Sequence, residues 1–335
     1  MKRYLVTGVA GFIASKVAEL LLAAGHVVIG LDNINDAYDV RLKEWRLSRL
    51  QGRPDFSFRE MDICDSRNLE KRMSEDGPFD AVINLAARAG VRQSLESPGI
   101  YVDTNVKGAL NMLEFSRRYA VKKFIQASSS SVYGANDVRP YREDGDTTRP
   151  LSPYAATKRA SEALCYSYHH VYGLDITVLR YFTVYGPAGR PDMLLFRLVQ
   201  SVHESRPTTI FGDGTQQRDF TYVEDIARGT VAALAPAGFA IFNLGSDRPI
   251  KVLDCIRLIE ELSGQKAILK FKPAQAADVA ATWADISQAR QRLRWQPQVL
   301  YEDGVKRSID WYQEHRSWAR DIRTEKIGLI SRHRF

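Results

Sequence analysis

A glycine-rich turn near the N-terminus constrains the fold of this chain more than any other feature of its sequence. Gly8 and Gly11 stand between an apolar run at residues 3–7 and a helical pattern of apolar residues at 12–24. A second apolar run follows at 27–31, so the segment predicts the strand, helix and strand that begin a parallel sheet. Glycines in such a turn let the backbone approach a phosphate group at the helix N-terminus, although they can also serve the turn alone.

Asp32 ends the second strand and makes the turn much more specific. A carboxylate about 20 residues after such a turn accepts hydrogen bonds from a ribose 2′-hydroxyl and repels a 2′-phosphate. The combination predicts a bound dinucleotide and favours NAD over NADP. Residues expected to contact it lie in the turn and at the ends of the second, third and fourth strands: Gly8, Gly11, Phe12, Ile13, Asp32, Asn33, Asp62, Ile63, Leu85, Ala86 and Ala87.

The alternation of strand and helix patterns continues well beyond this unit and predicts an α/β fold with a doubly wound, Rossmann-type parallel sheet. Further strands are expected at 56–60, 80–85, 123–127 and 175–180, and helices at 67–75, 103–119 and 154–172. Later helices are expected near 192–204, 223–235 and 252–263, and short strands near 208–211, 240–244 and 267–271. We predict a cofactor-binding domain at 1–187, a smaller mixed α/β substrate region at 188–312 that is interleaved with it, and a basic tail at 313–335 that forms a solvated helix or frays.

Composition excludes several classes of protein. Hydrophobic residues make up 44% and charged residues 26% of the 335, which is typical of a globular chain. The three cysteines are scattered, so neither a disulfide framework nor a metal site is predicted. No apolar run approaches the ~18 residues of a membrane span and no signal peptide precedes the first strand, so we expect a cytoplasmic protein without a membrane partner.

The net charge of +7 leaves the kind of partner open at first, because nucleic acid, a membrane surface or an anionic small molecule would each suit it. The basic residues are scattered along the chain, and no patch interleaves them with aromatic residues. We therefore expect no nucleic acid to bind.

Tyr154 and Lys158 have the i, i+4 spacing that places two side chains on one face of a helix. A tyrosine with its ordinary pKa of ~10 is a poor base at neutral pH, whereas a neighbouring ammonium favours the phenolate. In a chain with 15 tyrosines such a pair can arise by chance, so its place matters more than its spacing. It follows the run from Ser128 to Ser131 at the carboxyl end of the fifth strand, where ligands of parallel sheets bind. Serine, tyrosine and lysine together predict a hydride-transfer site.

The segments TGVAGFIA, SSSSVYG and YAATK resemble the extended short-chain dehydrogenases that act on nucleotide sugars. Within that group the chain is most similar to the bacterial UDP-glucuronate 4-epimerases, through the strings LDNINDAYDV, AGVR, YFTVYGP and GRPDM. The resemblance covers residues 2–312 and implies NAD as cofactor and a UDP-sugar as substrate. It also implies a homodimer that pairs the helices at 103–119 and 154–172 across a four-helix bundle.

The resemblance further implies roles for individual residues. Ser129, Tyr154 and Lys158 are the expected catalytic residues, and the last two also contact the cofactor. Asn105 and Tyr181 are the other cofactor residues that it implies. The substrate contacts expected are Phe211 near the uracil, Asp278 near the ribose, Arg218 near the diphosphate, Arg190 on the carboxylate or the diphosphate, and Arg88, Ser129, Ser130, Ser131 and Thr183 around the sugar.

Ser130 and Ser131 distinguish between related reactions. Related 4,6-dehydratases carry Asp-Glu directly after the catalytic hydroxyl residue, and related UDP-glucuronate decarboxylases carry a Glu two places after it, whereas this chain has serine at both places. Without those carboxylates the simplest chemistry is transient oxidation at C4, rotation of the 4-keto sugar and return of the hydride. The alternatives are another UDP-hexose 4-epimerase, a UDP-glucuronate decarboxylase, or an NAD-binding sensor without turnover.

Arg88 departs from the family pattern, in which Gln is common at this place. Three interpretations are open. The guanidinium binds the substrate carboxylate, the substitution indicates that the substrate carries a different sugar, or the guanidinium pairs with another residue on the surface. The sequence favours none of these three interpretations over the others.

Overall fold

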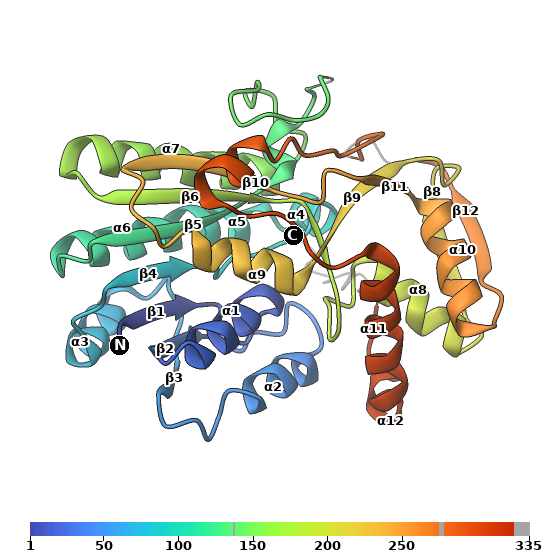
Figure 1. Ribbon diagram of the computed structural model, residues 1–335, viewed down its shortest axis with the longest axis horizontal. Helices are drawn as coiled ribbons and strands as arrows, with labels where there is room; N and C mark the ends of the chain where they lie inside the picture. Colours follow the sequence, from blue (N-terminus) through green and yellow to red (C-terminus); the bar gives the residue numbers. More distant parts are fainter. Residues whose placement is uncertain (137, 275–277, 325–335) are drawn as a thin grey trace, which may run out of the picture.

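A seven-stranded sheet forms one side of the molecule and a smaller lobe forms the other (Figure 1). The computed structural model describes residues 1–136, 138–274 and 278–324. The strands of the large sheet are β1 (Arg3–Thr7), β2 (Val27–Asp32), β3 (Phe56–Glu60), β4 (Ala81–Asn84), β5 (Lys123–Ser129), β6 (Asp175–Tyr181) and β10 (Phe239–Leu244). They lie in the order β3-β2-β1-β4-β5-β6-β10, and each neighbouring pair is parallel. The predicted doubly wound α/β class is confirmed.

Helices cover both faces of this sheet. The helices on this side of the molecule are α1 (Phe12–Ala23), α2 (Val40–Ser48), α3 (Ser66–Asp76), α4 (Val91–Glu96), α5 (Pro98–Tyr101), η1 (Val102–Gly108), α6 (Ala109–Arg118), η2 (Ser130–Tyr133), α7 (Pro153–Tyr172), α9 (Val223–Ala232) and η3 (Ala289–Leu293). Successive residues of a strand point to opposite faces, and here both faces are buried. In β1, Tyr4 and Val6 pack on the side of α1 and α9, whereas Leu5 packs with Met112 of α6 on the other side.

The smaller lobe has its own apolar core, which includes Phe196, Ile256 and Ile309. Its elements are β7 (Thr183–Tyr185), α8 (Leu194–His203), β8 (Pro207–Phe211), β9 (Gln217–Tyr222), β11 (Pro249–Lys251), α10 (Val252–Ser263), β12 (Ile268–Lys272), α11 (Tyr301–Glu314) and α12 (Arg316–Ala319). β11, β9 and β7 form one small sheet, and β12 pairs with β8. Because α9 and β10 return to the large sheet, the division at 187 and 312 remains a proposal.

The beginning of the basic tail differs from expectation. Ala319 and Ile322 are buried in the core of the smaller lobe, and the Gln200 side chain donates to their carbonyl groups at 3.0 and 2.8 Å. The expectation of a frayed tail is therefore wrong for residues up to 324, because Ala319 and Ile322 hold the segment against α8. The basic side chains Arg316, Arg320 and Arg323 are exposed, as a solvated helix requires. The rest of the predicted tail, residues 325–335, lies outside the described residues.

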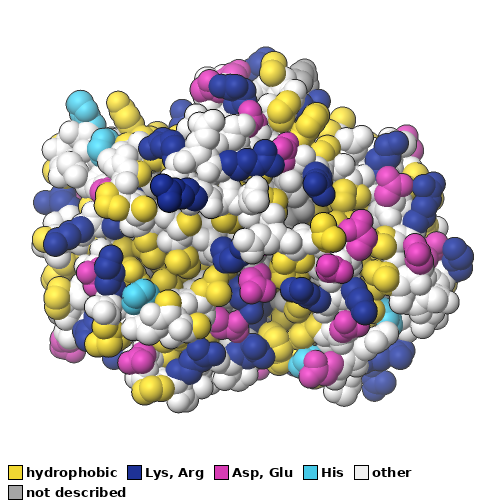
Figure 2. Space-filling model, in the orientation of Figure 1, with side chains coloured by type: hydrophobic (Ala, Val, Ile, Leu, Met, Phe, Trp, Pro, Cys, Tyr) yellow, Lys and Arg dark blue, Asp and Glu magenta, His cyan; other side chains and the backbone are white. Residues whose placement is uncertain are grey.

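Charged side chains of both signs are interspersed on the face shown in Figure 2, and the basic ones do not gather into one patch there. None of the helices in the described part of the chain is long and apolar enough to cross a membrane.

Candidate active site

A cleft of about 480 Å³ opens at the carboxyl ends of the parallel strands. It lies where the strand order turns from β1 to β4, the place where open parallel sheets bind ligands. The predicted residues Asn105, Phe211, Arg218 and Asp278 lie outside its lining. The predicted residues that line it are Gly8, Gly11, Phe12, Ile13, Asp32, Asn33, Asp62, Ile63, Leu85, Ala86, Ala87, Arg88, Ser129, Ser130, Ser131, Tyr154, Lys158, Tyr181, Thr183 and Arg190.

The glycine-rich turn has the shape that a bound diphosphate requires. Gly8 adopts a φ of +69°, and a Cβ atom there would lie 2.9 Å from the backbone of Ala86. A Cβ atom at Gly11 would lie 2.8 Å from the Gly8 carbonyl oxygen, to which the Gly11 N–H donates at 2.7 Å. The turn keeps open a space before the N-terminus of α1, where N–H groups and the helix dipole favour phosphate. These residues fit a dinucleotide cofactor.

Asp32 ends β2 and holds the loop that follows it. Its carboxylate accepts hydrogen bonds from the N–H of Ala10 at 3.2 Å and of Ile34 at 2.9 Å. Lys43 of α2, which sequence reasoning missed, brings its Nζ within 3.4 Å of the same carboxylate, and both side chains are buried. Because Lys43 offsets part of the charge that would repel a 2′-phosphate, preference for NAD depends on space and hydrogen bonding more than on repulsion.

The start of α7 positions Tyr154 and Lys158. Ser152 caps the helix, since its Oγ accepts the N–H of Ala155 at 3.1 Å, and Pro153 takes the first helical position. Tyr154 therefore lies in the first turn, facing the cleft, and Lys158 lies one turn deeper.

The predicted catalytic side chains converge at the end of β5. The Nζ of the buried Lys158 donates to the Ala127 carbonyl at 2.9 Å. The Ser129 hydroxyl lies close enough to the Tyr154 phenol to act to lower the pKa of that phenol. It also donates to the Ser131 hydroxyl at 3.2 Å. This arrangement can hold a substrate hydroxyl between a serine and a tyrosine, which is the geometry that proton transfer needs.

A buried ion pair ties α7 to the sheet beside Lys158. Glu162 lies one turn beyond Lys158, and Arg180 of β6 donates to both of its carboxylate oxygens at 2.9 Å. Ser128 donates to the same carboxylate at 2.6 Å. Burial lowers the pKa of Lys158 to about 8, and the Glu162 charge, already engaged by Arg180, offsets only part of that effect.

Arg190 lines the same cleft as Tyr154, and its positive charge acts on the Tyr154 phenol. Burial raises the pKa of Tyr154, while the Ser129 hydroxyl and the charge of Arg190 act in the opposite direction. Arg190 is itself held by Asp192, which accepts two hydrogen bonds from it at 3.1 and 2.6 Å. The net pKa of the phenol stays above its ordinary value, so a further positive charge must approach before Tyr154 becomes a good base.

The match to known proteins extends over most of the chain. Residues 4–245 match the NAD dependent epimerase/dehydratase family. This chain belongs to that family. The UDP-glucuronate 4-epimerase of Thermodesulfobacterium geofontis is 52% identical over 324 residues, which are 96% of this chain and 100% of that protein. The predicted family is confirmed.

Solved epimerase structures share the architecture. The UDP-glucuronic acid 4-epimerase from Bacillus cereus, in complex with UDP-glucuronic acid and NAD, is 38% identical with a TM-score of 0.87, over 93% of this chain and 99% of that one. The UDP-glucose 4-epimerase of Thermotoga maritima, with UDP-glucose, is 33% identical with a TM-score of 0.85 and the same coverage.

Arg92 of this epimerase-family chain contacts two of the predicted residues that lie outside the cleft lining. Its guanidinium lies 4.1 Å from the centre of the Phe211 ring, and its Nη2 is 2.9 Å from Asp278. Burial lowers the pKa of Arg218, the charge of Asp278 opposes that shift, and the charge of Arg92 adds to it. Sequence reasoning quoted Arg92 only within a motif, because its contact with Asp278 spans 186 residues of chain.

Asn105 lies outside the cleft lining and holds the main chain of Arg88, which lines the cleft. Its Oδ1 accepts the N–H of Arg88 at 2.8 Å, and its Nδ2 donates to the Arg88 carbonyl at 2.9 Å. The same Nδ2 donates to the Thr157 hydroxyl of α7 at 3.0 Å. One buried carboxamide, on the π-helical segment η1, therefore sets the Arg88 main chain relative to the helix that carries Tyr154.

The Arg88 side chain lines the cleft, and its guanidinium makes no hydrogen bond or ion pair with the described residues. Burial acts to raise the pKa of Asp62, but hydrogen bonds and the charge of Arg88 bring it below its ordinary value. Burial raises the pKa of Tyr101 to about 12 although the charges of Arg190 and Arg88 oppose it. Arg88 therefore lies between the Asp62 side of the cleft and the Tyr154 side, where the Tyr101 ring is 6.2 Å from that of Tyr154.

Proposed function

We propose that this chain is a UDP-glucuronate 4-epimerase, which interconverts UDP-glucuronate and UDP-galacturonate with bound NAD. The convergence of Ser129, Tyr154 and Lys158 at the end of β5 carries the proposal. The relatives at 52% and 38% identity that bear this name support it. The prediction of an NAD-dependent epimerase is confirmed by the family match.

The residues that would hold NAD are those of the glycine-rich turn, Asp32 and Asp62, and the small residues after β4. When bound, NAD supplies the hydride acceptor and, in its oxidised form, a positive charge near Tyr154. The Tyr154 Oη then takes the proton of the C4 hydroxyl while the Ser129 hydroxyl holds the same oxygen. We assign to Lys158, which is protonated below its pKa of about 8, the role of favouring the phenolate that this step requires.

The sugar can rotate in the site if the nucleoside diphosphate is held at one end and the cleft leaves space at the other. We assign the nucleoside diphosphate to the cluster of Arg92, Phe211, Arg218 and Asp278 at the edge of the cleft. The sugar then lies in the cleft of about 480 Å³. A 4-keto sugar held only through its diphosphate can rotate about that link, and return of the hydride to its other face inverts C4.

The 4-keto intermediate is a β-keto acid, so the site must also prevent loss of carbon dioxide. Decarboxylation requires the C6 carboxylate to leave in line with the carbonyl π-system. Hydroxyl groups of Ser130, Ser131 and Thr183 and the Arg190 guanidinium line the cleft. We assign them to hold the carboxylate away from that alignment.

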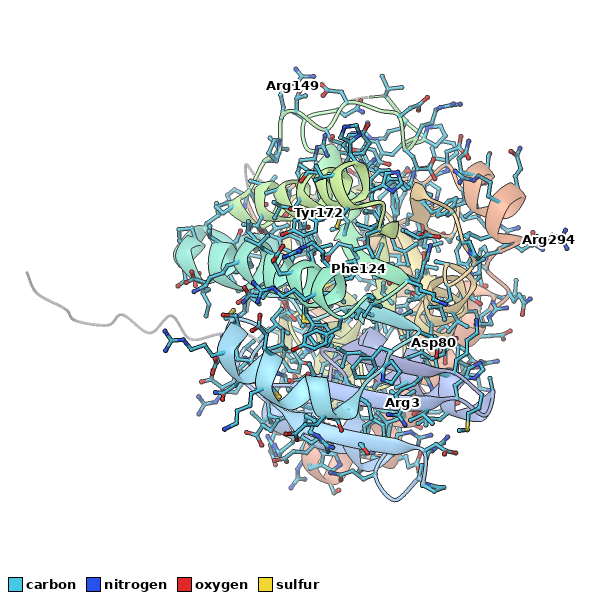
Figure 3. All side chains as sticks on the ribbon, turned by 90° about the vertical axis from the view of Figure 1, so that its left-hand side faces the viewer. Arg3, Asp80, Phe124, Arg149, Tyr172 and Arg294 are labelled. Carbon is cyan, nitrogen blue, oxygen red and sulfur yellow. The ribbon has the colours of Figure 1, made fainter. Side chains whose placement is uncertain are left out.

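We also propose a homodimer through the outer face of α7 and the neighbouring helices. α6 and α7 lie side by side at the end of the molecule shown in Figure 3, with Tyr172 at the end of α7. Ala156, Ala163 and Tyr166 are exposed at helical spacing along α7, and Val102 is exposed on η1. Apolar faces on adjacent helices suit a four-helix bundle between two subunits. Light scattering is expected to give twice the 37.9 kDa chain mass, and a monomer at micromolar concentration would contradict the dimer.

One experiment separates the candidate functions. The purified protein is incubated with UDP-glucuronate, UDP-glucose or UDP-galactose, and products are followed by proton NMR. UDP-galacturonate formed without carbon dioxide is the expected result. A UDP-pentose would identify a decarboxylase, turnover confined to UDP-glucose and UDP-galactose would identify another UDP-hexose epimerase, and bound NAD without any turnover would identify a sensor.

A further inference from the structure

Arg46 of α2 is a buried cation outside the site described above. Its side chain is 2% exposed. On one side its Nε and Nη2 donate to the Ala188 carbonyl at 3.1 and 2.6 Å. On the other side its Nη1 donates to the carbonyl of Ala10, in the glycine-rich turn, at 3.2 Å and to the Tyr38 hydroxyl at 2.8 Å. One guanidinium therefore joins the cofactor turn to a loop more than 140 residues away.

No carboxylate of the described residues forms an ion pair with Arg46. Carbonyl dipoles and two aromatic faces surround it instead, with the guanidinium carbon 5.7 Å from the Phe12 ring and 5.5 Å from the Tyr38 ring. Burying a cation without a counter-charge is unfavourable. The arrangement is therefore more than packing: the fork of donors is what this position requires, and lysine cannot reproduce it.

The loop that Arg46 holds is conformationally demanding. Gly186 has a φ of +150° and Ala188 a φ of +52°. A non-glycine residue at positive φ persists only where its surroundings hold it. Arg46 donates twice to the carbonyl of Ala188, and Arg190 follows two residues later.

We propose that Arg46 is a positioning residue, which locks the loop at 186–190 onto the glycine-rich turn and so keeps Arg190 in register with the cofactor. This inference rests on the proposed function. Arg190 lines the cleft and its charge acts on Tyr154, so a loosened loop weakens substrate binding and the ionisation of Tyr154 together.

The first test is Arg46→Lys, which keeps the charge and loses the fork. We expect kcat/KM for UDP-glucuronate to fall about tenfold. The acid limb of its pH profile moves to higher pH, because a displaced Arg190 charge lowers the Tyr154 pKa less. Arg49→Lys is the matched control, since Arg49 is exposed at the C-cap of the same helix and pairs with Glu19; it is expected to behave as wild type.

A double-mutant cycle with Arg190→Ala separates positioning from general stability. If Arg46 acts through Arg190, adding Arg46→Lys to Arg190→Ala lowers kcat/KM by less than about twofold more. Losses that multiply would overturn the inference. Tyr38→Phe, which removes one partner of Arg46, enters the same cycle if Arg46→Lys does not fold, as judged by thermal unfolding and NAD content.

The inference and the proposed function fail in different ways. A wild-type protein that does not epimerise UDP-glucuronate overturns both. An active epimerase in which Arg46→Lys matches Arg49→Lys, in rate and pH profile, overturns only the role of Arg46.

Discussion

The two halves of the proposed site differ in how they are built. The proposed cofactor half, within the cleft, uses main chain in close approach, as where Gly8 meets the backbone of Ala86. The proposed substrate half includes the cluster outside the cleft lining, where long side chains meet from distant segments, as where Arg92 reaches both Phe211 and Asp278. A change of backbone shape should therefore affect the cofactor, whereas a change of side-chain charge should affect the substrate. Substitutions in each half test this contrast.

Tyr154 stands where the halves meet, and Tyr154→Phe is expected to have the largest effect. Loss of the base should lower kcat about 1,000-fold, within the range for general acid–base catalysis, while NAD stays bound. Rates by NMR and NAD content by absorbance measure the two effects. Tyr166→Phe, on the exposed face of the same helix, is the control. Turnover of Tyr154→Phe within tenfold of wild type would refute the assigned base.

Gly8→Ala tests the cofactor half. A methyl group at this φ and at 2.9 Å from the Ala86 backbone should weaken NAD binding roughly 100-fold, since both conformation and space are lost. Gly25→Ala is a matched control, because Gly25 has a φ of +76° with nothing within 4 Å of its would-be Cβ atom. Calorimetry on stripped protein gives both affinities. Equal losses in the two variants would mean that strain alone matters and that close approach does not.

Arg218→Gln tests the substrate half. Removing a charge from the diphosphate site should raise KM for UDP-glucuronate about 30-fold through lost charge-assisted hydrogen bonds, with NAD affinity unchanged. Arg248→Gln, at an exposed arginine, serves as the control. If Arg218→Gln also releases NAD, the two halves are not separable and the contrast fails.

The buried ammonium of Lys158 makes the stability of the protein depend on pH. Its folded-state pKa of about 8 lies below the ordinary 10.5, so burial of the ammonium destabilises the protein by about 3 kcal/mol below pH 8. Because the unfolded chain binds more protons between these values, this contribution to stability rises with pH from about 8 to 10.5.

Lys158→Met should therefore stabilise the cofactor-free protein by about 1–2 kcal/mol near pH 7, since loss of the bond to Ala127 offsets part of the gain. The difference should shrink near pH 10, and turnover should be lost. Urea unfolding at the two pH values measures it, with the exposed Lys107→Met as control. A destabilised Lys158→Met at both pH values would contradict this account.

Arg88 is expected to show the smallest effect and to sharpen the boundary between the halves. Arg88→Gln removes a cation that forms no ion pair with the described residues, so KM for UDP-glucuronate should rise about threefold with little change in NAD affinity. Steady-state kinetics and NAD titration measure the two quantities. A loss of NAD affinity instead would move Arg88 to the cofactor half.

Sequence reasoning found what local patterns carry. The turn at Gly8 and Gly11 and the acid at Asp32 were predicted because their spacing follows from one βαβ unit. The buried positions of Lys43 and Arg46 were not predicted, because charged residues on a short helix are usually exposed to solvent. A signal existed, since both lie on one face with Leu42 and Leu47, and this is the buried face of α2.

The sequence by itself determined the parallel sheet, the cofactor turn and the spacing of Tyr154 and Lys158, because strand and helix periodicities and i, i+4 spacing are local properties. Only the tertiary structure decided which charges are paired: Lys43 with Asp32, Arg190 with Asp192, Arg92 with Asp278. It also decided that Arg46 joins two loops. A long side chain finds its partner through space and desolvation, and neither is written in the pattern of its sequence neighbours.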